Sequence, residues 1–108
     1  MVNDTIVGSG KFKFKVIENW ENLPAGFNWK ETAGVITDNN DDIYVFNRGN
    51  HPVIVFDRLG NFKSSWGENI FTRPHGLTLA PDNTIFCVDD GDHTVRKCTL
   101  KGEVLMTL

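Results

Sequence analysis

Apolar and polar residues alternate in short runs along most of the chain, and turn-forming residues separate the runs. The runs cover residues 35–37, 43–47, 52–57, 62–67, 77–79, 85–89, 94–99 and 104–108. They are rich in β-branched and aromatic residues, and the stretches between them contain Gly, Asn or Asp. Alternation over four to eight residues is typical of a half-buried strand. Because no helical periodicity accompanies it, the pattern predicts an all-β protein.

The chain repeats itself at an offset of 42 residues without a gap. Residues 34–62 align with residues 76–104, and Gly49 meets Gly91. A gapless period of about 40–50 residues is the size of a β-propeller blade. Each unit contains four short strands, so we expect two four-stranded antiparallel meanders. The predicted organisation is a leading outer strand and linker (1–33), a first blade (34–75) and a shorter second blade (76–108).

Composition narrows the classes of partner. The net charge is −3 and 40% of the 108 residues are hydrophobic, which suits a single soluble domain. Without a basic run, we expect neither a nucleic-acid nor a membrane partner. The stretch "KFKFK" (11–15) indicates a strand with one solvated face. No apolar run approaches the roughly 20 residues of a membrane span, and the first ten residues lack the plan of a secretion signal.

The two cysteines, Cys87 and Cys98, fall at alternating apolar positions of neighbouring runs. Without a wider cysteine framework, buried free thiols are favoured over a disulfide across the hairpin. No CxxC pair indicates a structural zinc site.

Some residues carry a resemblance to a known family. The stretch "IYVFNRGNHPVIVFDRLGNF" (43–62) resembles an NHL repeat, the unit of six-bladed β-propellers. The stretches "FNRGNH" and "FTRPHGL" resemble the catalytic core of peptidyl-α-hydroxyglycine α-amidating lyases and of similar bacterial NHL propellers. The resemblance covers roughly residues 30–108. It implies two of six blades, so we expect three chains to complete one propeller as a homotrimer, with the leading strand 11–16 at the outer edge of a neighbouring blade.

His75 is the first candidate site residue. Its repeat partner is Ala33, so blade construction does not require a histidine there. It precedes the innermost strand, where propeller loops open toward the central channel. The spacing leaves a metal ligand and a turn histidine open as interpretations. In the resembled lyases the matching histidine is one of three that hold a catalytic zinc. A threefold ring would bring three copies of His75 to the channel.

Arg48 is the second candidate, and its repeat partner is Asp90. It is either a surface charge or a fork for a carboxylate. The lyases have an active-site arginine at the matching position, so the resemblance implies a catalytic role. Asn47 and Asn50 stand where the lyases usually have His and Asp.

The resemblance also implies calcium. The carbonyl groups of Val35 and Leu77 match carbonyls that hold a structural calcium in the lyase channel. The acidic turns 38–42 and 89–92 lack the spacing of a calcium loop, and we expect solvated turns there.

Other notable residues have structural interpretations. His51 and His93 recur at the same repeat position, which favours a role in ordering the turn, with the imidazole bonded to local backbone. Tyr44 aligns with Phe86 and is expected in the core. The lyase family's catalytic tyrosine and its two other zinc histidines come from blades that these residues do not include.

Two functions follow as expectations. The first is a non-catalytic propeller module, a self-assembling scaffold whose channel binds a peptide, a small molecule or a partner. The alternative is a zinc-assisted lyase that cleaves peptidyl-α-hydroxyglycine into a peptide amide and glyoxylate. Fold analogy alone does not assign the activity.

Overall fold

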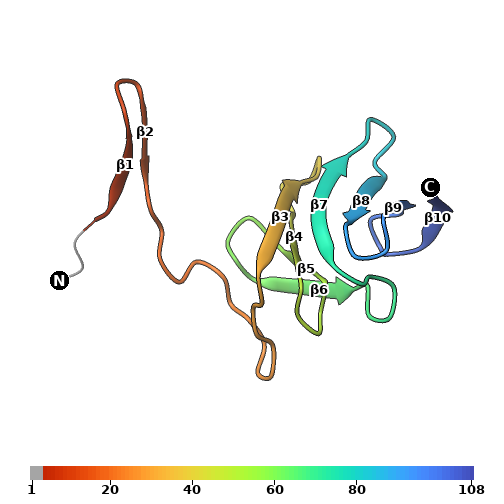
Figure 1. Ribbon diagram of the computed structural model, residues 1–108. Helices are drawn as coiled ribbons and strands as arrows, with labels where there is room; N and C mark the ends of the chain where they lie inside the picture. Colours follow the sequence, from red (N-terminus) through yellow and green to blue (C-terminus); the bar gives the residue numbers. More distant parts are fainter. Residues whose placement is uncertain (1–3) are drawn as a thin grey trace.

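The computed structural model describes residues 4–108, which form ten β-strands (Figure 1). In chain order these are β1 Ile6–Ser9, β2 Phe12–Lys15, β3 Thr32–Thr37, β4 Ile43–Asn47, β5 Val53–Phe56, β6 Phe62–Trp66, β7 Pro74–Leu79, β8 Ile85–Asp89, β9 Thr94–Cys98 and β10 Val104–Thr107. They make antiparallel sheets of two, four and four strands, none closed into a barrel in this part of the chain. The all-β class is therefore confirmed. No helix within residues 4–108 is long and apolar enough to cross a membrane.

The two four-stranded sheets share one strand order, which follows the chain. Sheet 1 is β3-β4-β5-β6 and sheet 2 is β7-β8-β9-β10, with antiparallel pairing between consecutive strands. β4 and β8 have the bounds that the alternation predicted, whereas β3 and β7 begin earlier, at Thr32 and Pro74. Both sheets are meanders compatible with propeller blades.

The turns repeat as well as the strands. Asp41 and Asn83, 42 residues apart, have φ values of 62° and 63°, and Asn and Asp tolerate this left-handed conformation best among non-glycine residues. Gly60 and Gly102, also 42 apart, have φ values of 87° and 93°. The turn residues therefore fix the same hairpins in both sheets.

The main core lies between the two sheets. Sheet 1 contributes Tyr44, Phe46, Val53, Val55 and Trp66, and sheet 2 contributes Ile85, Cys87 and Cys98. β3 and β7 lie side by side (Figure 1). A Cβ on Gly34 would be 3.3 Å from the backbone nitrogen of Leu77, so glycine allows these strands to approach closely.

Both cysteines are free and fully buried in this core, as the sequence predicted. The neighbouring Cys98 thiol and burial raise the pKa of Cys87 well above its ordinary value. Cys87 therefore remains a protonated thiol.

The segment before sheet 1 differs from the expectation of one leading strand. β1 and β2 pair with each other as a hairpin, in which Ile6 lies opposite Lys15 and Ser9 opposite Phe12. The hairpin contacts no other strand among residues 4–108 and stands away from the sheets (Figure 1). β2 therefore pairs with β1 on one edge, which the sequence pattern did not predict, and the place of strand 11–16 at a neighbouring blade stays a prediction.

The linker, residues 16–31, covers the face of sheet 1 that points away from sheet 2. Trp20 packs edge-on against Phe56, with ring centroids 5.7 Å apart, and Trp29 lies 6.0 Å from the same ring. Phe27 packs against Phe62 and stacks on His51. Phe56 is consequently fully buried although no strand covers it on that side.

Candidate functional site

Five charged or titratable side chains meet where the inner strands β3 and β7 begin. Arg48 follows β4 and Asp90 follows β8, whereas Glu31 and Arg73 precede β3 and β7. His75 is the second residue of β7. Because neighbouring strands in a meander run antiparallel, the end of β4 or β8 lies beside the start of β3 or β7. The fold therefore brings these residues to one end of the two sheets.

Arg48 links the two sheets. Its Nε donates a hydrogen bond to the carbonyl of Pro74 (2.9 Å), and its NH1 donates to a carboxylate oxygen of Glu31 (2.7 Å). Its NH2 lies 3.5 Å from Nδ1 of His75. The side chain is only 17% exposed, so it is largely occupied in holding strand β7 and the linker. This low exposure argues against the interpretation of Arg48 as a surface charge.

His75 stands at the edge of the same cluster with its side chain 60% exposed. Its Nδ1 faces Oδ2 of Asp90 at 3.4 Å as well as the Arg48 guanidinium. The two candidate residues chosen from the sequence, Arg48 and His75, are therefore neighbours in space, 27 residues apart in the chain.

The ion pairs of the cluster repeat with reversed charge. In sheet 1, Glu31 pairs with Arg48, and in sheet 2, Arg73 pairs with Asp90 at 3.3 Å. Both members are shifted by 42 positions, and each acid is replaced by a base and each base by an acid. The same joint between linker and second strand is thus closed by an ion pair in each sheet.

The electrostatics of the cluster are nearly balanced. The hydrogen bond and charge of Arg48 lower the pKa of Glu31 below its ordinary value. Two cations face two carboxylates, with His75 between them. Oδ1 of Asp90 is buried and has no hydrogen-bond partner among residues 4–108. Arg48 and Arg73 therefore have their charges compensated within the chain.

The acidic turns are solvated only in part: Asn39, Asn40 and Asp41 are exposed, as expected, but each turn also contains a buried aspartate. Asp89 is 1% exposed, and its carboxylate accepts hydrogen bonds from the backbone amides of Thr72, Arg73, Gly91 and Asp92. Burial alone raises its pKa, but the four amides outweigh burial, and the pKa lies below the ordinary value. A turn aspartate here supplies acceptors to backbone groups that would otherwise lack them.

Asp38 and Asp42 in the first acidic turn are also buried. Asp38 accepts hydrogen bonds from the amides of Asn40 and Asp42 and from the hydroxyl of Tyr44. Burial and Asp38 raise the pKa of Tyr44 well above its ordinary value. Tyr44 lies in the core, as expected.

The recurring histidines do not order their turns in the expected way. His51 does not bond local backbone through its ring: Nδ1 lies 3.0 Å from a carboxylate oxygen of Glu68, and the ring stacks on Phe27 with centroids 3.8 Å apart. The turn is closed instead by Asn47, whose side-chain amide donates to the His51 carbonyl. His93 is exposed and has a φ of 61°. A shared repeat position therefore gives the two imidazoles different surroundings.

Val35 and Leu77, the calcium positions implied by resemblance, lie on the adjoining inner strands β3 and β7. Val35 is 62% exposed and Leu77 is half-buried. A zinc site is not assembled within one chain: residues 4–108 contain no group of three or more His, Cys, Asp or Glu side chains placed to hold a metal. Within one chain, His75 has both the Arg48 guanidinium and the Asp90 carboxylate as neighbours.

A second polar feature lies beside the cluster. A hollow of about 300 Å³ is lined by Gly26, Asn28, Trp29, Lys30, Gly49, Asn50 and His51. It forms where the linker crosses the turn between β4 and β5. Lys30 provides a cation and Trp29 an aromatic wall, so the hollow suits a small polar ligand.

Sequence reasoning missed Glu31, Arg73 and Asp90. The available signal was the offset of 42, which pairs residue 31 with 73 and residue 48 with 90 and shows the reversed charges.

Compared with models of known protein families and with curated proteins, the sequence matches none.

Proposed function

We propose that the chain is a non-catalytic β-propeller module of the NHL type, which associates with further copies of itself and acts as a scaffold for a small ligand or partner. The observation that carries the proposal is an uncovered sheet face. On sheet 1, Tyr44, Phe46 and Trp66 are 5%, 0% and 7% exposed because sheet 2 covers them.

The matching positions of sheet 2 are uncovered. Phe86 and Val88 are half-buried and Leu108 is 70% exposed, and Met106, which aligns with Ser64, is 41% exposed. On the other side of the molecule, Val35 of β3 is 62% exposed, whereas its repeat partner Leu77 packs in the core. A second copy would present its sheet 1 together with the linker residues Trp20 and Trp29 that lie on it. This combined surface would cover the apolar face of sheet 2.

Such a contact is head-to-tail, and repetition of one rotation either closes a ring or continues as a filament. Two blades per chain and six blades per ring give a homotrimer. In that ring the Arg48 and His75 cluster of each chain would face the channel, beside the hollow at Trp29 and Lys30. We assign the binding of a small ligand or partner to the end of the sheets where this cluster and the hollow lie.

Light scattering at protein concentrations from the low micromolar range up to 100 µM tests the assembly. We expect a mass three times that of the chain, and Val88→Asp should weaken association because it places a charge in the apolar face. Leu59→Asp is the matched control, since Leu59 is exposed in a turn outside both faces. A wild-type protein that stays monomeric throughout the range would refute the proposal.

The alternative function, a peptidyl-α-hydroxyglycine lyase, is favoured by one observation, the contact between Arg48 and His75. Zinc, if it takes part, would supply Lewis-acid chemistry and would need His75 from more than one copy. Glyoxylate release from a hydroxyglycine peptide, with and without zinc, tests this alternative. Turnover that His75→Ala abolishes, without loss of fold, would replace the scaffold proposal. Elemental analysis of wild type and His75→Ala decides separately whether zinc is bound.

A further inference from the structure

Trp20 in the linker occupies on sheet 1 the position that Trp66 occupies on sheet 2. The indole Nε1 of Trp66 donates a hydrogen bond to the carbonyl of Leu100 (3.1 Å), and its ring lies against Gly102. The indole Nε1 of Trp20 donates to the carbonyl of Arg58 (3.3 Å), and its residue lies against Gly60. Both the acceptors and the glycines are 42 residues apart.

The equivalence of Trp20 and Trp66 indicates which strand of a blade the linker corresponds to, although the linker is not a strand in this structure. Trp66 is the last residue of β6, the outer strand of sheet 1. If Trp20 corresponds to Trp66, the segment 16–20 corresponds to β6, residues 62–66. It therefore has the place of an outer strand whose own sheet is not among residues 4–108.

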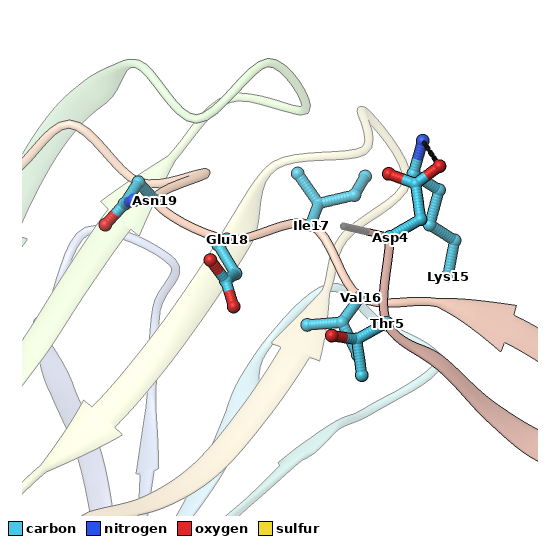
Figure 2. A pocket seen from close by; sticks show the side chains of 7 residues that line it. All are labelled: Asp4, Thr5, Lys15, Val16, Ile17, Glu18 and Asn19. Carbon is cyan, nitrogen blue, oxygen red and sulfur yellow. Dashed lines mark ion pairs between the residues drawn. The ribbon is translucent and has the colours of Figure 1, made fainter. Parts of the chain in front are cut away.

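The segment 16–20 is poised for pairing. It is not a strand in this structure: Val16 to Asn19 are exposed, and Asn19 has a φ of 54°. Figure 2 shows Ile17 and Glu18 projecting to opposite sides of the chain, beside a hollow of about 440 Å³. The amide of Val16 already donates to the carbonyl of Thr5 (2.8 Å). Residues 17–19 are the part of the segment that remains for pairing, and the side chains of Ile17 and Glu18 alternate as they do in a strand.

The register of sheet 1 predicts which residues the segment would meet. β5 pairs with β6 so that Val55 lies opposite Ser64, and Val53 opposite Trp66. Transferred by the repeat, Glu18 would lie opposite Lys97 of β9, and Trp20 opposite Val95. Opposite charges across antiparallel strands stabilise the pairing.

In the chain itself, β10 holds this position. Met106 lies opposite Lys97 in β10, and all four residues of β10 are exposed. β10 itself offers Lys97 no carboxylate, and the Lys97 charge is paired at 3.0 Å with Asp82 of the hairpin between β7 and β8. Glu18 of segment 16–20 would add a second carboxylate on the open side of β9. The larger Trp20 would also replace Leu108 at the end of the strand.

We propose that segment 16–20 of one copy displaces β10 of a second copy and completes its sheet 2, pairing with β9. The partner is a second copy because its β9 has the register and the charge that the segment matches. Because Trp20 also packs on sheet 1 of its own chain, it would join that sheet to the completed sheet 2 of the neighbouring copy. This inference rests on the self-association proposed above and names the contact that makes it.

The charge pair allows a direct test by light scattering on the full chain. In an Asp82→Asn background, which removes the Lys97 pair within the chain, Glu18→Lys and Lys97→Glu should each weaken association by about tenfold, since each places like charges opposite one another, and combining them should restore it. Glu103→Lys is the control, because it makes the same charge change as Glu18→Lys in the turn before β10, outside the proposed pair.

Hydrogen exchange distinguishes strand exchange from simple stacking of faces. In concentrated protein, amides of residues 16–20 should gain protection while those of β10 lose it. If the wild type associates but Glu18→Lys associates equally well and β10 stays protected, strand exchange is wrong and the assembly stands. If the wild type is monomeric at 100 µM, both proposals fail.

Discussion

The indole ring of Trp66, at the end of sheet 1, lies against the backbone of Gly102 in sheet 2. A Cβ on Gly102 would be 2.7 Å from Cδ2 of that ring, closer than real Cβ contacts. The φ of Gly102 is 93°, which side chains other than glycine rarely adopt. The contact between these two residues therefore joins the sheets and requires glycine for two independent reasons.

Gly102→Ala should lower the free energy of unfolding by about 2 kcal/mol or more, because backbone strain and the clash with Trp66 add. Urea unfolding followed by tryptophan fluorescence measures it. Gly26→Ala is the matched control: its φ is 86°, and nothing lies within 4 Å of a Cβ there. Equal losses in both variants would show that the Trp66 contact contributes nothing.

Arg48→Gln should reduce stability by about 1–2 kcal/mol, because the carbonyl of Pro74 loses a charged donor at a largely buried site. Arg58→Gln, in an exposed turn, provides the control and should change stability by less than about 0.5 kcal/mol. Thermal unfolding of both variants checks the expectation. An Arg48 variant as stable as the wild type would mean that Arg48 does not link the sheets.

Asp89→Asn should lower the free energy of unfolding at pH 7 by about 1–3 kcal/mol. The two carboxylate oxygens together accept four backbone amides, and the substitution replaces one of these oxygens with an NH2 donor. The pKa of Asp89 lies below its ordinary value of 3.8, so the stabilisation by its charged form is present above pH 3.8 and is lost as pH falls through the lower folded pKa. Wild type and variant should therefore converge in stability once the pH falls below the lowered pKa of Asp89. A difference that stays constant with pH would contradict this assignment.

Cys87 and Cys98 should react with a thiol reagent on the order of a hundredfold more slowly in the native protein than after unfolding, because both are fully buried. Lys101→Cys, in an exposed turn, adds a third thiol that should react at once. Absorbance of the released product follows all three. Rapid reaction of two thiols in the native wild type would show that the sheets open readily.

The sequence by itself determined the strands of both sheets. Alternation sets which residues of a strand share a face, and the turn residues set where strands end, so β4 and β8 have their predicted bounds. The offset of 42 determined that two similar meanders exist. Both signals are local, because strand pairing between neighbours in sequence needs only short turns.

The surroundings of the polar residues were decided only by the tertiary structure. Asp89 is in a turn, where solvent is the ordinary expectation, yet amides from the segment before β7 converge on it. His51 and His93 share one repeat position, yet only His51 meets Phe27, which the linker supplies. The predicted strand 11–16 pairs with β1, a strand that the alternation did not predict. Local patterns place a side chain on a face, whereas its partners come from segments distant in the chain, which only the packing of sheets and linker brings together.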